Sequence, residues 1–133
     1  ILKKLGEHCY LTLHPDSNFL LVMDVKNKKD VLGDRSCFSA LRVYLKNCDI
    51  DHNLLVKYFG FLTDQDHICL FEEYLEGETL EHCINNPRED FNESTIGPII
   101  CSILTAIEYF RSIGKPYGII SPRNILYSMV LTP

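Results

Sequence analysis

Short hydrophobic runs separated by turn residues dominate the first half of the chain. The runs at 9–13 and 19–25 flank the turn-forming residues of 14–18, a pattern that predicts a β-hairpin. Two later runs, at 54–62 and 67–73, are separated by a short polar turn and predict a further pair of strands. This half of the chain is therefore expected to form a small antiparallel sheet.

Helical periodicity lies between these strand pairs and returns after them. Apolar residues recur at helical spacing within 36–46, where Asp34 or Ser36 is expected to cap the start of a helix. A shorter helix is predicted at 79–84. The segment 119–126 is an apolar loop and strand around a proline.

The longest predicted helix covers residues 92–114. Its apolar residues follow the spacing of one helix face: Ile96, Ile99, Ile100, Ile103, Leu104, Ile107 and Phe110. Asn92 is expected to cap this helix and Gly114 to end it, while Pro98 should remove a hydrogen bond or kink the first turns. The order of strands, helix, strands and helices predicts an α+β fold.

Composition and charge are those of one ordinary globular domain and argue against several function classes. Of 133 residues, 46% are apolar and 23% are charged, and the net charge is −5. A mildly acidic chain lacks the positive field that nucleic acids and anionic membranes attract. The longest apolar stretch, 96–107, contains a glycine and a proline and is too short to span a bilayer. We therefore expect no nucleic-acid partner and no membrane insertion.

The six cysteines do not have the spacing of a metal or redox site, because no two of them form a C-x-x-C pair. Each lies among apolar residues, so free thiols in a reducing compartment are expected, although an even number also permits disulfides. Lys3, Lys4 and Glu7 interrupt the start of any signal peptide. A cytoplasmic protein without a metal site is expected.

The last third of the chain carries a motif that resembles a known family. The long helix is followed by Tyr117-Gly118-Ile119-Ile120-Ser121-Pro122-Arg123-Asn124-Ile125-Leu126. This arrangement resembles the C-lobe helix and catalytic loop of protein kinases, in which the loop reads H-R-D-x-K-P-x-N-I-L.

Three earlier segments resemble other parts of a kinase, in the right order. They are 5–13 for the glycine-rich loop, 52–60 for the strand after the first helix, and 70–77 for the fifth strand and hinge. The resemblance implies a kinase-like N-lobe at 1–74, with an antiparallel sheet and one helix. The hinge, the first C-lobe helices and the catalytic loop would follow at 75–133, as an incomplete domain.

The same resemblance indicates that the groups for phosphoryl transfer have been replaced. Ile119 stands where a carboxylate accepts the proton of the substrate hydroxyl, and isoleucine cannot take up a proton. The loop histidine, arginine and lysine are Tyr117, Gly118 and Ser121. Asn124 remains at the place of a magnesium ligand, and it also suits a turn asparagine that bonds the backbone. We expect no catalytic residue and no metal.

The resemblance also implies a degenerate nucleotide site, so that ATP is at most an occasional ligand and no cofactor is expected. Of the three loop glycines only Gly6 remains, with His8 and Leu11 in the other positions. Lys26 stands at the end of the V-A-I-K strand, whereas an ungapped count puts Asp24 in the lysine position. Both alternatives place a carboxylate near a nucleotide.

Glu72 occupies the gatekeeper position just before the hinge. As a buried carboxylate it needs a cation, a proton or solvent, and we expect it to pair with Lys26. No glutamate lies between 37 and 48, so the Lys–Glu ion pair of active kinases cannot form. Asp24 and Glu72 would repel a polyphosphate. The apolar positions that would enclose adenine, which a core would need in any case, are Leu5, Leu13, Leu75 and Leu126.

Among kinases, the chain resembles the pseudokinase domain of the Janus tyrosine kinases. Gly118 follows the first residue of the loop, 72–77 reads Glu-Glu-aromatic-x-Glu-Gly, and Phe38 lies early in the first helix. The resemblance implies an inactive module that regulates another kinase domain, in cis or in trans, in kinase signalling. The alternatives are a nucleotide-binding pseudokinase, an active kinase with displaced catalytic groups, and a truncated mimic that binds and inhibits a kinase.

Overall fold

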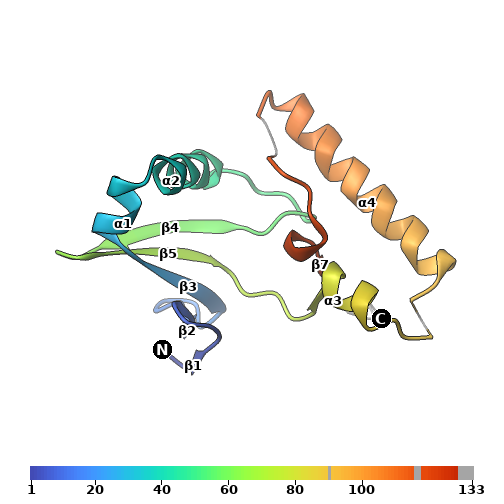
Figure 1. Cartoon of the computed structure of the whole chain (residues 1–133), viewed down its shortest axis with the longest axis horizontal. Helices are drawn as coiled ribbons and strands as arrows, with labels where there is room; N and C mark the ends of the chain where they lie inside the picture. Colours follow the sequence, from blue (N-terminus) through green and yellow to red (C-terminus); the bar gives the residue numbers. More distant parts are fainter. Residues whose placement is uncertain (90, 116–117, 129–133) are drawn as a thin grey trace. The chain divides into compact units, whose positions relative to one another are not determined.

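The computed structural model describes residues 1–89, 91–115 and 118–128, and the chain divides into two compact units, Ile1–Tyr74 and Leu75–Pro133 (Figure 1). The first unit contains a five-stranded antiparallel sheet in the order β1-β2-β3-β5-β4. Its elements are β1 (Lys3–Lys4), β2 (Cys9–Leu13), β3 (Leu20–Asn27), α1 (Lys28–Gly33), α2 (Arg35–Asn47), β4 (Tyr58–Thr63) and β5 (His67–Glu73).

The predicted hairpin is confirmed as β2 and β3. Its register pairs Leu13 with Leu20 at the turn and Cys9 with Asp24 at the open end. The turn is closed by a hydrogen bond from the His14 amide to the Phe19 carbonyl, and Asn18 adopts a left-handed conformation that asparagine tolerates well. β3 also pairs along its length with β5, so it is the central strand of the unit.

The predicted helix at 36–46 is confirmed as α2, and Asp34 rather than Ser36 caps it. The Asp34 carboxylate accepts hydrogen bonds from the amides of Ser36 (2.7 Å) and Cys37 (3.3 Å). The helix α1 was not predicted from the sequence. Asn27 caps α1, and Val31 is its one buried residue.

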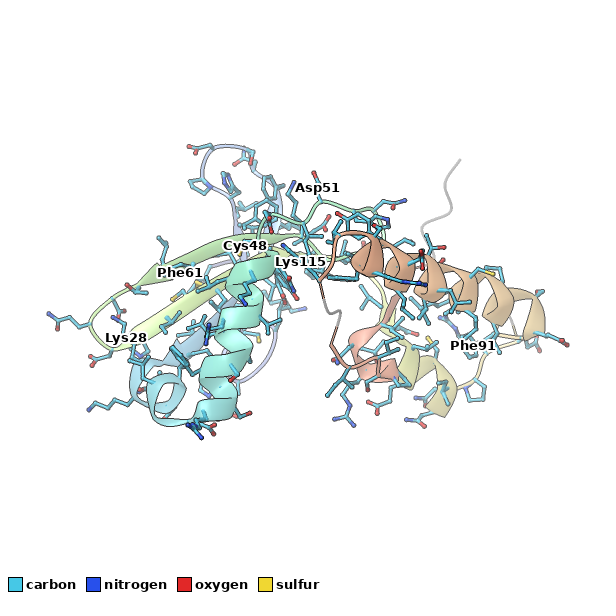
Figure 2. The ribbon with its side chains drawn as sticks, turned by 90° about the horizontal axis from the view of Figure 1, so that it is seen from above. Lys28, Cys48, Asp51, Phe61, Phe91 and Lys115 are labelled. Atoms are coloured by element: carbon cyan, nitrogen blue, oxygen red, sulfur yellow. The ribbon has the colours of Figure 1, made fainter. Side chains whose placement is uncertain are left out.

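Tyr44 fastens α2 to the sheet. Its hydroxyl donates to the backbone carbonyls of Gly60 (2.9 Å) and Phe71, which lie on β4 and β5. Its ring also packs against Tyr58, with the centroids 4.5 Å apart. α2 accordingly lies over the β4–β5 side of the sheet (Figure 1), and Cys48 follows its last turn (Figure 2).

The strand predicted at 54–62 is shorter than expected, whereas β5 has the predicted bounds. Before β4 the backbone makes a turn in which the Leu55 amide bonds the His52 carbonyl and the Leu54 amide bonds the His52 ring. Within β4 a bulge shifts the register between Tyr58 and Gly60.

The second unit is mainly helical. Its elements are β6 (Glu78–Thr79), α3 (Leu80–Asn85), α4 (Glu93–Ser112), the 3-10 helix η1 (Pro122–Asn124) and β7 (Leu126–Tyr127). Asn92 caps α4 in a capping box with Thr95, and Gly114 follows the helix in a left-handed conformation, as predicted. α4 runs through Pro98 without ending there (Figure 1).

Few side chains are deeply buried among the described residues. In the first unit they are Leu21, Val31, Ile50 and Ile68, and in the second Cys83 and Phe110. On the apolar face of α4, Ile96, Ile100 and Leu104 are 41–59% exposed, so this face is only partly packed. None of the described helices has the length and hydrophobicity needed to cross a membrane.

Candidate functional site

Asp24 and Lys26 form an ion pair on β3. Because they are two residues apart in a strand, their side chains point to the same face of the sheet, and Lys26 Nζ lies 2.7 Å from Asp24 Oδ2. The hydrogen bond to Asp24 raises the pKa of Lys26. Both alignments that the sequence left open for the kinase lysine therefore lead to the same acid–base pair.

Glu72 lies on the same face of the sheet, directly opposite Val22, while Asp24 is opposite Leu70. Burial raises the pKa of Glu72, and the nearby charge of Asp24 raises it further, while Lys26 lowers it. The predicted pairing of Glu72 with Lys26 is wrong, because Lys26 pairs with the carboxylate two residues away on its own strand. Within the first unit, which is described in full, the Glu72 carboxyl has no ion pair, so uptake of a proton is its remaining route to neutrality.

Two residues that lie opposite Asp24 and Glu72 were not identified from the sequence. Cys9 lies opposite Asp24 across the hairpin, with its sulfur 3.8 Å from Asp24 Oδ1. Tyr58 lies opposite Glu72, and burial followed by the charge of Glu72 raises the pKa of Tyr58. Counting back along the predicted hairpin would have found Cys9. The pairing of Tyr58 could not be found by counting residues, because the bulge in β4 shifts the register.

The loop between β1 and β2 contains the residues expected to correspond to the glycine-rich loop. The amides of Leu5 and Gly6 both donate to the carbonyl of Cys9, at 2.9 and 3.2 Å. The carbonyl of His8 accepts from the Val25 amide of β3. Since these two amides already have an acceptor, they are not available to a phosphate unless the turn opens.

In the second unit, the kinase-like loop leads into η1. Ile119 is 86% exposed, and Gly118 adopts a positive φ of 85° that favours glycine. The Asn124 amide bonds the Ser121 carbonyl at 2.9 Å, and among the described residues no hydrogen bond to the Asn124 side chain is found. Tyr117, expected at the histidine position, lies outside the described residues.

The loop is held against α3 and β6 after η1. The Leu80 amide donates to the Ile125 carbonyl at 2.8 Å, and Arg123 lies 3.6 Å from the carboxylate of Glu81. β7 then pairs with β6. In the described part of the chain, His, Cys, Asp and Glu side chains form no cluster of three that could hold a metal ion.

The four leucines expected around adenine are not core residues. Leu5 and Leu13, in the first unit, are 42% and 41% exposed, and Leu75 and Leu126, in the second, are 39% and 38% exposed. The interpretation that they merely fill a core is therefore wrong. Their apolar side chains are partly exposed to solvent.

Comparison with known proteins places this arrangement in a family. Residues 8–130 match the family described as protein kinase domain. An Aurora kinase of Debaryomyces hansenii is 27% identical over 94% of this chain, and a Wee1-like protein kinase 1-A of Xenopus laevis is 25% identical over 81% of it. The aligned parts cover 30% and 20% of those two proteins. Because the family match covers nearly the whole chain, the chain belongs to the protein kinase domain family.

Proposed function

We propose that the chain is a catalytically inactive pseudokinase that binds and regulates another kinase domain, in cis or in trans, in the cytoplasm. The observation that carries this proposal is Ile119, a largely exposed apolar side chain at the position that the resemblance assigns to the catalytic carboxylate. Isoleucine can neither accept the proton of a substrate hydroxyl nor orient that hydroxyl. The general-base step of phosphoryl transfer therefore has no group at this position.

The residues of the first unit that would face a nucleotide support the same proposal. Lys26, a cation that could face phosphates, is paired with Asp24, and Glu72 adds a second carboxyl on the same face. A polyphosphate would have to break the ion pair and approach two acidic groups. Because the amides of Leu5 and Gly6 already donate to the Cys9 carbonyl, they do not provide hydrogen bonds that would offset this cost.

The role as a regulatory interaction module rests on the resemblance to Janus pseudokinases and on the family membership. The two relatives named above are kinases by name, and this chain departs from the kinase motif at Ile119, Gly118 and Ser121. A family member that has lost its chemistry can still act through its surface, by favouring one of two states in a partner kinase.

Phosphate release by the purified chain tests the inactivity. With Mg-ATP and a general protein substrate, we expect no release above the rate of a blank without protein. Activity that disappears in Asn124→Ala but persists in the matched control Asn47→Ala would contradict the proposal and restore the alternative of an active kinase with displaced groups.

One alternative, a nucleotide-binding pseudokinase, is favoured by the exposure of Leu5 and Leu13 in the first unit. Exposed leucines at the adenine positions are what a purine ring would contact. We expect no thermal shift with millimolar Mg-ATP. A shift that is lost in Leu75→Asp but kept in the control Leu62→Asp would instead support nucleotide binding. The other alternative, a mimic that inhibits a kinase in trans, shares the proposed binding function.

A further inference from the structure

A shallow groove of about 560 Å³ opens on the first unit, outside the degenerate nucleotide site. Its volume lies in the range of pockets that hold small molecules or a few peptide side chains. Glu73 at its edge pairs with Leu21, so it points to the sheet face opposite Asp24 and Lys26. The groove is lined by Asn18, Phe19, Leu20, Lys57, Phe59, Glu73 and Tyr74.

Aromatic rings form one wall of this groove. Phe19 stacks on His14 with the ring centroids 4.7 Å apart, and it contacts Phe59 at 5.0 Å. Phe19 and Phe59 nevertheless remain 37% and 39% exposed. Exposed aromatic rings that are held in place by their neighbours are typical anchors of a protein interface, since little side-chain entropy is lost on binding.

The charges around the groove leave one negative charge unpaired. Lys57 Nζ lies 3.3 Å from Asp51 Oδ2, on the loop before β4 (Figure 2), and 5.9 Å above the ring of Phe59. Among the described residues, the Glu73 carboxylate accepts one hydrogen bond, from the backbone amide of Lys57 at 3.3 Å. Lys57 is thus paired with Asp51, a residue outside the lining, while the Glu73 carboxylate, which lines the groove, has no ion pair within this unit. A complementary ligand therefore places one positive charge at Glu73.

Arginine meets these requirements better than lysine does. Its planar guanidinium stacks on aromatic faces and bonds a carboxylate with two parallel donors, whereas an ammonium is a strongly hydrated point charge. Glu73, the last residue of β5, and Tyr74, which follows it in sequence, both line the groove. Phe19, Leu20 and Phe59 supply apolar surface beside them.

We propose that this groove binds a partner polypeptide through an arginine flanked by apolar side chains, with the guanidinium on Glu73 and Tyr74 and the apolar neighbours on Phe19 and Phe59. The proposal rests on the proposed function, because it gives the binding module a partner chemistry.

Binding of a short peptide tests the groove. The probe is acetyl-Ala-Leu-Arg-Leu-Ala-amide, and its citrulline version is the matched neutral control, titrated into the ¹⁵N-labelled 133-residue chain and followed by NMR. We expect shifts at the amides of the lining residues and about tenfold weaker binding of the citrulline peptide. Equal binding of the two peptides overturns the proposal.

Variants of the chain complete the test. Glu73→Gln keeps an oxygen for the Lys57 amide and should abolish the preference for arginine. Phe59→Ala should weaken both peptides, while Phe61→Ala, 49% exposed on the same strand but outside the groove (Figure 2), should change neither. An equal loss in both phenylalanine variants, or sedimentation showing that a second copy of the chain fills the groove, overturns the assignment. These results are independent of phosphate release, so the groove can fail while the proposed function stands.

Discussion

At the scale of single residues, Glu72 and Asp24 place two carboxyl groups on one face of the sheet with only Lys26 to balance them. Burial and Asp24 hold the pKa of Glu72 above its usual value of 4.5. A carboxyl whose pKa is raised by folding stabilises the folded state fully below pH 4.5, and this contribution is lost as the pH rises through the raised pKa. Above its raised pKa, the ionised Glu72 is therefore destabilising.

Replacing Glu72 by glutamine tests this directly. The variant keeps the shape and removes the charge, so its free energy of unfolding at pH 7 should exceed that of the parent by about 1–3 kcal/mol. The gain should shrink as the pH falls toward 4. Urea denaturation at both pH values measures it, with Glu76→Gln as an exposed control. A gain that is independent of pH would contradict the assignment.

Tyr44 gives a second prediction at this scale. Burial raises its pKa to about 12, with a smaller contribution from the nearby Cys48. The stability that it contributes is present at neutral pH and is lost as the pH rises from 10 toward 12. Tyr44→Phe should lower the free energy of unfolding at pH 7 by about 1–3 kcal/mol, because the partly buried hydroxyl and its hydrogen bonds to the carbonyls of Gly60 and Phe71 are lost. Denaturation of both proteins, with Tyr10→Phe as control, checks the value, and equal losses would contradict it.

At the scale of elements, the sequence predicted what depends on local periodicity. The bounds of β5 were correct, and α2 and α4 were found because their apolar residues recur at helical spacing. The helix α1 was missed because it has six residues and buries only Val31. The first residues of the strand predicted at 54–62 are apolar but form a turn on His52.

The site was less predictable than the elements, because it depends on which groups meet across strands. Hydrophobic pattern placed Asp24 and Glu72 on strands, and the resemblance to the V-A-I-K strand placed Lys26 at a strand end. Neither determines which carboxylate Lys26 pairs with. The acid two residues away on its own strand is available without any tertiary contact, and it pairs with the lysine. The exposure of Leu13 and Leu75 likewise depends on packing that no local pattern contains.

The pairing of β6 with β7 depends on Gly77. Its φ of +154° is strained for other residues, and a Cβ there would lie 2.6 Å from the carbonyl oxygen of Tyr127. Gly77→Ala should therefore destabilise the second unit by about 1–3 kcal/mol. The control Gly97→Ala, in α4 with open space around it, should be neutral or stabilising by up to about 1 kcal/mol. Thermal unfolding compares the two, and similar losses would refute the close approach.

At the scale of the whole molecule, the six cysteines are all free thiols and differ in burial. Cys37 and Cys101 are exposed, whereas burial raises the pKa of Cys9, Cys48, Cys69 and Cys83. Because the thiolate is the reactive form, a thiol reagent at pH 8 should modify Cys37 and Cys101 first and the buried Cys83 last. Peptide mass spectrometry over time gives the order. Early labelling of Cys83 would contradict the packing of α3.

The partly exposed apolar face of α4 has a practical consequence for handling the isolated chain. Ile100 and Leu104 meet water with half or more of their surface, so a polar residue there removes little packing from the second unit. Concentrated samples should aggregate through this apolar face and become turbid, and the fluorescence of a hydrophobic dye should increase when the dye binds there. Ile100→Lys together with Leu104→Glu should keep such samples clear while the helix remains intact.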